Sequence, residues 1–119
     1  MHELSMCRNL LRTAERVAAE RGSGRVVAIL VSIGPLAGVD GGQLARAFSL
    51  ARKGTIAESA ELTFEMAPVV VHCDECGGDD GAAPNDLLCR ACGSRAVQLK
   101  SGAELTVRRV DLAIDTEVD

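Results

Sequence analysis

The sequence predicts an α+β fold in which two helices pack on a small mixed β-sheet that carries an inserted, cysteine-rich minidomain. Three observations support this fold class: two segments with helical apolar spacing, alternating segments typical of strands, and two Cys-x-x-Cys pairs between those strands. The length of 119 residues suits one small domain with an insert.

The segment 3–21 is predicted to be an amphipathic helix. Its apolar residues follow a spacing of three and four, at Leu4, Cys7, Leu11, Ala14 and Ala18, and charged side chains occupy half of its other positions. Gly22 is placed to end this helix, because glycine is the usual residue after a helix terminus.

The next apolar segment, 25–33, is rich in β-branched residues and has the length of a strand. Its odd-numbered residues from Val27 to Ile33 form the more apolar face. A Gly-Pro pair at 34–35 ends the strand.

A second helix is predicted to begin after Asp40 and to run to about Arg52. Aspartate is a preferred N-cap residue because its carboxylate accepts hydrogen bonds from the first free backbone N–H groups. Leu44 and Phe48 give this segment its apolar side, and Gly54 closes it.

Two further strands are predicted from alternation. In 61–66, Leu62, Phe64 and Met66 share one face, and polar residues share the other. The segment 103–115 alternates as well, but its phase changes at Arg108-Arg109, so we predict a β-bulge there.

The intervening residues have a different composition, rich in Cys, Gly and Asp, and cannot bury enough apolar surface to fold without help. Both flanking strands need the same core. We therefore predict an α+β domain made of residues 1–70 plus 103–119, with a minidomain inserted at 71–102.

Four cysteines have the spacing of a metal site: Cys73, Cys76, Cys89 and Cys92. Two residues between cysteines let both sulfurs face one ion, and two such pairs complete a tetrahedron. Zinc is favoured over a rubredoxin-like iron centre, and either is favoured over disulfides or free thiols. Four thiolates leave no position for water, so this zinc-ribbon-like site is predicted to be structural, and a hydrolytic zinc enzyme is disfavoured.

Two neighbouring side chains have alternative interpretations. His72 precedes the first cysteine and could replace a thiolate, but a residue there is more often the end of a strand. Cys7 lies on the apolar side of the first helix, where a buried free thiol is expected.

Composition excludes several classes of partner. A net charge of −4, a pI near 5.2 and only two aromatic residues argue against nucleic-acid binding. No apolar run approaches the ~20 residues of a membrane span, and the charged first twenty residues do not form a signal peptide. The cytoplasm is the expected compartment, and no membrane partner is expected.

The amino end, Met1-His2-Glu3, offers a second candidate metal site. A bulky second residue is expected to keep the initiator methionine in place. The amine of Met1, the amide and imidazole nitrogens of His2 and the amide of Glu3 could then form a square plane, which suits nickel(II) or copper(II) and not zinc. The alternative is a frayed terminus.

The order of several motifs resembles the HypA/HybF family. These motifs are MHELSMC, VSIG, LARAF followed by GT-x-AE-x-A-x-L, the two Cys-x-x-Cys pairs and SG-x-EL-x-V. The resemblance implies a nickel metallochaperone for [NiFe] hydrogenase maturation, serving urease in some organisms. It implies nickel binding at Met1, His2 and Glu3, and zinc at the four cysteines. Its implied partners are a nickel-binding GTPase and the precursor of the hydrogenase large subunit; a homodimer is left open.

Two other functions remain open from the residues alone. A zinc-ribbon adaptor that binds a protein without nickel cargo would share the cysteine site. A thiol redox protein would need an exposed cysteine with a low pKa in a βα turn, whereas both pairs here lie in loop-rich sequence.

Overall fold

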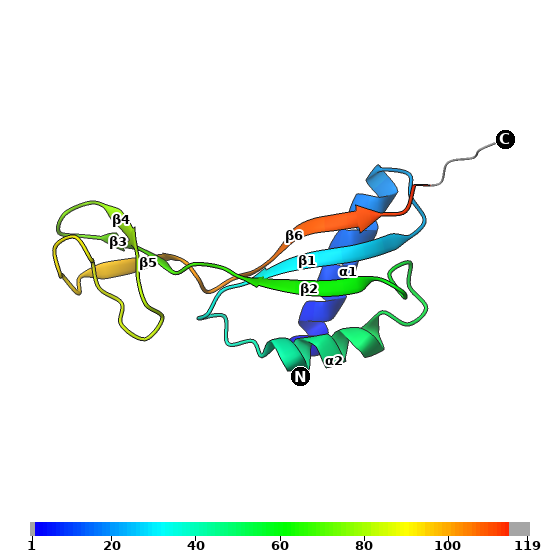
Figure 1. Ribbon diagram of the computed structural model, residues 1–119, viewed down its shortest axis with the longest axis horizontal. Coiled ribbons are helices and arrows are strands. Elements are labelled where there is room, and N and C mark those ends of the chain that lie inside the picture. Colours follow the sequence, from blue (N-terminus) through cyan, green and yellow to red (C-terminus); the bar gives the residue numbers. More distant parts are fainter. Residues whose placement is uncertain (1, 115–119) are drawn as a thin grey trace. The chain divides into compact units, whose positions relative to one another are not determined.

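The computed structural model describes residues 2–114 of the chain. Within them the elements follow the order shown in Figure 1: α1 (His2–Glu20), β1 (Val26–Ile33), α2 (Gly41–Ala51), β2 (Glu61–Met66), β3 (Val70–Cys73), β4 (Asp79–Gly81), β5 (Val97–Ser101) and β6 (Leu105–Leu112). In this described part, no helix is both long and apolar enough to cross a bilayer.

These residues form two compact units. The first, the helical unit, comprises 2–31, 40–64 and 107–114 of the described residues. The second, the cysteine unit, comprises Ser32–Val39 and Glu65–Thr106. The predicted division into a nickel-binding domain and a zinc-binding insert stays a prediction.

Helix α1 matches the predicted segment to within one residue at each end. Of the predicted apolar positions, Leu4 is half-buried and the other four are buried, together with Leu10: Cys7, Leu10, Leu11, Ala14 and Ala18. Gly22 follows the helix with φ 72°, a left-handed conformation that glycine adopts without a steric cost.

Helix α2 begins at the predicted cap. The Asp40 carboxylate accepts hydrogen bonds from the backbone N–H groups of Gly42 at 2.8 Å and Gln43 at 3.2 Å. The helix buries Leu44 and Phe48. The Cys7 thiol donates a 3.3 Å hydrogen bond to the Leu44 carbonyl, which ties α1 to α2.

One sheet has the order β2-β1-β6. The Val26 N–H donates to the Ile56 carbonyl before β2, and the Ala67 N–H after β2 donates to the Ile33 carbonyl. The two strands therefore start together and end together, so β1 and β2 are parallel. Helix α2 forms part of the crossover that parallel neighbours require.

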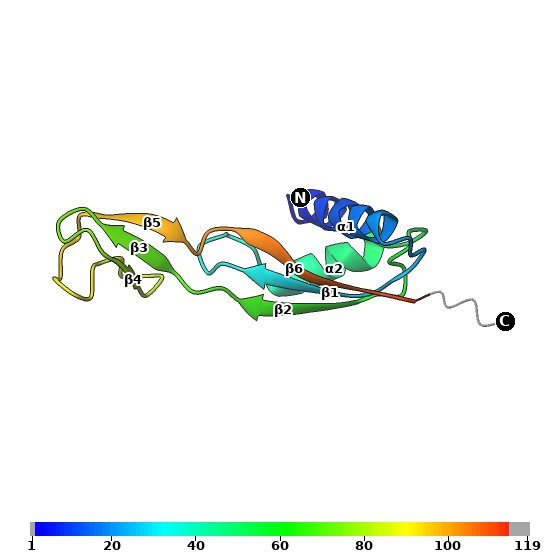
Figure 2. The same ribbon diagram turned by 90° about the horizontal axis from the view of Figure 1, so that it is seen from above.

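Strand β6 runs against β1. The Gly34 N–H donates to the Glu104 carbonyl, and the Ala113 N–H donates to the Arg25 carbonyl, so the end of each strand meets the start of the other. The sheet is thus mixed. Figure 2 shows α1 and α2 on the same side of it, and the predicted fold class is confirmed.

The burial of β1 corrects one detail of the sequence prediction. Ile29, Val31 and Ile33 are buried as expected, but Val27 is 44% exposed and Val26 is fully buried in its place. Within β1 no polar residue precedes Ser32, so the sequence pattern could not fix the phase at the amino end of the strand.

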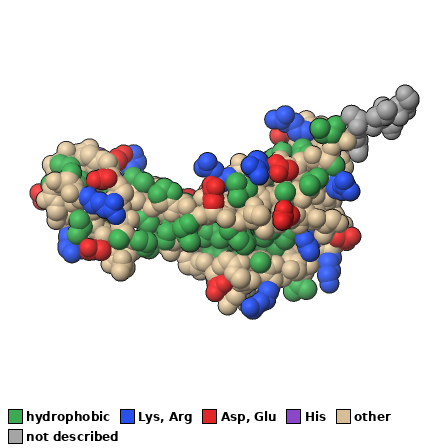
Figure 3. Space-filling view, in the orientation of Figure 1, with side chains coloured by type: hydrophobic (Ala, Val, Ile, Leu, Met, Phe, Trp, Pro, Cys, Tyr) green, Lys and Arg blue, Asp and Glu red, His purple; other side chains and the backbone are tan. Residues whose placement is uncertain are grey.

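Strand β2 lies at the edge of the sheet, and its apolar face is only partly covered. Phe64 is 37% exposed and Met66 is 70% exposed. Figure 3 shows apolar side chains gathered along this strand. The predicted apolar face of β2 is therefore only partly buried, because an edge strand has a neighbour on one side only.

Strand β6 shows the predicted change of phase. Arg108 and Arg109 are both exposed, whereas Val107 and Val110 on either side are half-buried. The bulge proposed to accommodate this change stays a prediction.

The cysteine unit contains an antiparallel sheet of order β4-β3-β5. Leu99 pairs with Val71 and Ser101 pairs with Val70, so Lys100 is the extra residue of a β-bulge in β5. Its small core consists of buried residues and half-buried neighbours: Val69, Val71, Ala82, Leu36, Leu87 and Val97.

Two glycines permit a close backbone contact in this unit. A Cβ on Gly34 would lie 2.1 Å from the carbonyl oxygen of Gly102, and a Cβ on Gly102 would lie 2.9 Å from the Val69 side chain. Gly102 also has φ 120°. The contact brings the segment after β1 against the turn between β5 and β6.

Candidate metal centres

The four cysteines predicted as ligands meet in one cluster. Their sulfur atoms all lie within 4.8 Å of one another, although β3 supplies the first and loops supply the others. The Cys73–Cys92 and Cys76–Cys89 sulfurs are 3.6 Å apart. A disulfide would require ~2.05 Å. Four sulfurs at ~2.3 Å from a tetrahedral zinc would be about 3.8 Å apart, so the donor set fits this ion.

The two Cys-x-x-Cys loops fold in the same way. In the first, the Gly77 N–H donates to the Cys73 carbonyl at 2.9 Å; in the second, the Gly93 N–H donates to the Cys89 carbonyl at 2.7 Å. Both glycines have positive φ, 78° and 76°, a conformation that glycine adopts without steric cost. The Cys76 N–H also points to the Cys73 sulfur, at 3.4 Å.

The thiols of the cluster differ in acidity. The Cys76 N–H lowers the pKa of Cys73 to about 7. At Cys92 the Ser94 N–H also favours the thiolate, but the neighbouring sulfurs of Cys73 and Cys89 outweigh it and raise the pKa to about 12. Four adjacent thiolates therefore need a cation, and binding one would release protons.

His72 lies beside the cluster but is not part of it. Its Nδ1 is 2.6 Å from the Asp79 carboxylate, which also accepts a 2.7 Å hydrogen bond from Lys100 Nζ. The sequence did not single out Asp79, because the short strand β4 that carries it has no alternating apolar pattern. His72 and Asp79 are partners across β3 and β4.

The second predicted site is described only from His2 onward, since Met1 lies outside the described residues. His2 is the first residue of α1, and its side chain is 59% exposed. Its Nε2 is 3.8 Å from the Glu3 carboxylate, whose side chain is 14% exposed. The backbone N–H of Glu3 itself is the main cause that lowers the pKa of this carboxyl.

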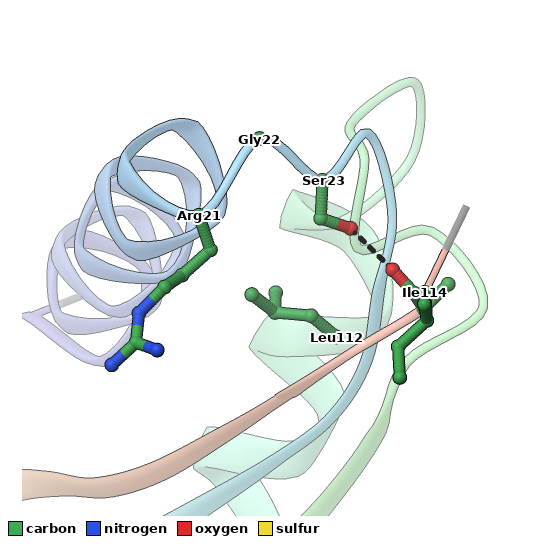
Figure 4. A pocket seen from close by; sticks show the side chains of 6 residues that line it. Arg21, Gly22, Ser23, Leu112 and Ile114 are labelled. Carbon is green, nitrogen blue, oxygen red and sulfur yellow. Dashed lines mark hydrogen bonds between the residues drawn. The ribbon is translucent and has the colours of Figure 1, made fainter. Parts of the chain in front are cut away.

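A surface hollow of about 360 Å³ in the helical unit lies between the end of α1 and the end of β6, and is lined by Arg21, Gly22, Ser23, Leu112, Ala113 and Ile114. Figure 4 shows the Arg21 guanidinium directed away from Ser23. The Ser23 hydroxyl is used structurally, because it donates a 2.8 Å hydrogen bond to the Ala113 carbonyl. Among residues 2–114, no histidine, cysteine or carboxylate lines this hollow.

Comparison with solved structures supports the fold. A solution structure of the Ni metallochaperone HypA from Helicobacter pylori has a TM-score of 0.76, with 21% identity, and the match covers 92% of this chain and 96% of that one. A second solution structure of a HypA protein has a TM-score of 0.75, with 24% identity over 95% and 97% of the two chains.

Sequence relatives are closer. The hydrogenase maturation factor HypA of Nitrosospira multiformis is 38% identical over 112 residues, which cover 94% of this chain and 97% of that protein. HypA of Aquifex aeolicus is 36% identical over 115 residues, 97% of this chain and 100% of the relative. The family model described as "Hydrogenase/urease nickel incorporation, metallochaperone, hypA" matches residues 1–112. The chain therefore belongs to the HypA family, as its motifs indicated.

Proposed function

We propose that this protein is a nickel metallochaperone, which binds Ni(II) at its amino end and helps to deliver it during hydrogenase maturation. Membership of a nickel-incorporation family supports this function. The observation in this chain that best supports nickel binding is the exposed imidazole of His2, the first residue of α1.

Nickel is the cargo, and its ligands are the amine of Met1, the amide and imidazole nitrogens of His2 and the amide of Glu3. The first N–H groups of any helix have no acceptor within the helix. Loss of the His2 amide proton to nickel therefore breaks no hydrogen bond of α1. Placement at a terminus also lets a partner displace the nitrogens in turn without disrupting a core.

Zinc is the resident metal, held by Cys73, Cys76, Cys89 and Cys92. The ion supplies folding energy to a unit with a small apolar core. Four sulfur ligands leave no position for a reacting water, so the protein is a carrier and not an enzyme. The two sites differ in donor type, because nitrogen donors in a plane suit nickel and tetrahedral thiolates suit zinc.

The proposed partners follow from the family's role. They are a nickel-binding GTPase and the precursor of the hydrogenase large subunit, with urease maturation as a further recipient in some organisms. A homodimer is compatible with this role. The place of action is the cytoplasm.

Nickel titration tests the ligand set. The wild type should bind about one nickel, with zinc unchanged, and should bind it more weakly at about pH 5.5 than at about pH 8 because the nitrogen ligands must lose protons. His2→Ala, and a variant with one residue added before Met1, should lose this nickel and keep zinc.

His72→Ala is the matched control, since the chain has two histidines and His72 lies outside the proposed site. It should bind nickel like the wild type. Stoichiometric nickel binding by the extended variant would place the ligands elsewhere. Zinc alone in the wild type, with no labile nickel, would favour the adaptor function.

A further inference from the structure

All three prolines of the chain line one groove of the cysteine unit. Pro35, Pro68 and Pro84 come from three separate segments and surround a hollow of about 310 Å³. Val69 and Ala82, at 4% and 9% exposure, are the buried part of the lining. The convergence of prolines from distant segments is a property of the fold, not of one proline-rich stretch.

The groove is apolar and stiff. Proline has a fixed φ and no backbone N–H, so its walls offer ring carbons and cannot rearrange easily. A preformed surface loses little conformational freedom when a ligand binds. The volume is near the lower end of the ~300–1,000 Å³ of ligand pockets, which suits one or two side chains better than a cofactor.

Arg90 is the charged residue of this lining. It is exposed, and its Nη1 lies 3.8 Å from the position that a Cβ on Gly81 would occupy. The other cations of 65–106 are paired, Arg95 with Asp86 at 3.0 Å and Lys100 with Asp79 at 2.7 Å. Within residues 2–114, no carboxylate pairs with Arg90.

We propose that this groove docks a short extended segment of a partner protein, in which an aromatic side chain is followed closely by an aspartate or glutamate. The aromatic ring packs on the proline rings, the pairing used wherever aromatic surfaces recognise proline. The carboxylate pairs with Arg90, whose planar fork matches it in a bidentate contact.

The protein itself does not supply the aromatic ring to this groove in the structure. Its two aromatic residues, Phe48 and Phe64, both belong to the helical unit. Neither phenylalanine lines the groove, and the ring is assigned to a partner. This docking surface goes beyond the proposed nickel function, because it uses neither metal site.

Peptide display on the zinc-loaded full-length protein tests the proposal. A random-peptide library should yield sequences with Phe, Tyr or Trp followed within two positions by Asp or Glu. On Arg90→Glu, selection should keep the aromatic residue but replace the acid with Lys or Arg. A synthetic peptide of the first class should bind Arg90→Glu at least about tenfold more weakly.

Arg16→Glu is the control, because Arg16 is an exposed arginine of α1 that does not line the groove. It should select the same peptides as the wild type. Pro84→Ser, which removes one wall, should reduce the aromatic preference with zinc retained. The same peptides on wild type and Arg90→Glu, or no enriched class, would overturn the proposal. So would a dimer that Arg90→Glu dissociates, since the occupant would then be a second copy.

Discussion

Asp79 is the residue at which three polar side chains of the cysteine unit meet. Its carboxylate binds Lys100 from β5 and His72 from β3, so it joins all three strands of the sheet. The Lys100 ammonium first, and His72 second, lower the pKa of Asp79. The ionised carboxylate is thus stabilised in the folded state.

A lowered pKa fixes the direction of the pH dependence. The contribution of Asp79 to stability should be present above the ordinary aspartate pKa of ~3.9 and should be lost as the pH falls through its lower folded value. Asp79→Asn should therefore lower the urea midpoint at about pH 7 and have less effect at about pH 3. An equal effect at both pH values would contradict this account.

The residues of the cysteine site could be predicted because spacing alone encodes a tetrahedral thiolate set. Their environment could not. Asp79 lies seven residues from His72 and twenty-one from Lys100, which is the extra residue of the bulge in β5. Such contacts depend on register, which no local pattern in 79–81 reveals.

Among the elements, α2 depends most visibly on one side chain. Asp40 accepts two hydrogen bonds from backbone N–H groups that have no partner within the helix. Asp40→Ala should destabilise the protein by about 1 kcal/mol, whereas Asp40→Asn should cost only a few tenths. Urea unfolding of both variants checks this, and equal losses would show that the charge matters more than the cap.

Both helices were predictable because their caps and apolar spacing are local signals. The strands were less so. Val27 of β1 was predicted on the buried face but is exposed, and Phe64 and Met66 of β2 are more exposed than their alternation implied. Edge or central position depends on the order β2-β1-β6, which is set by contacts between distant segments.

At the scale of the whole molecule, we expect that the helices can stay folded when zinc is lost from the cysteine unit. Cys89→Ser should release zinc and unfold the cysteine unit, because structural zinc contributes ~10–16 kcal/mol in small zinc peptides. Helix content should persist, since α1 and α2 belong to the other unit. Zinc analysis, far-UV circular dichroism and amide exchange at Val71 measure this.

Cys7→Ser provides the control for that experiment. It makes the same substitution outside the four-sulfur cluster and should keep zinc. A zinc-loaded, protected Cys89→Ser protein would refute the four-thiolate site. Loss of all helix signal would show that the two units fold together.

The close approach of the Gly34 and Gly102 backbones leaves no room for a side chain at Gly34. Gly34→Ala should cost more than about 2 kcal/mol, because its Cβ would overlap a backbone carbonyl that cannot swing aside. Gly24→Ala is the matched control, since nothing lies within 4 Å of its added Cβ. Equal urea midpoints for the two variants would mean that the chain relaxes around this contact.

The Cys7 thiol has a consequence for metal discrimination. Cys7 follows His2 in the same helix, but its side chain is fully buried and its thiol donates a hydrogen bond to the Leu44 carbonyl. Burial first, and the charge of Glu3 second, raise the pKa of this thiol to about 11. At neutral pH no sulfur anion is thus offered beside the amino end. Cys7 is therefore not available as a thiolate ligand for thiophilic ions such as Cu(I) at neutral pH, and it does not compete with the nitrogen donors of the proposed nickel site.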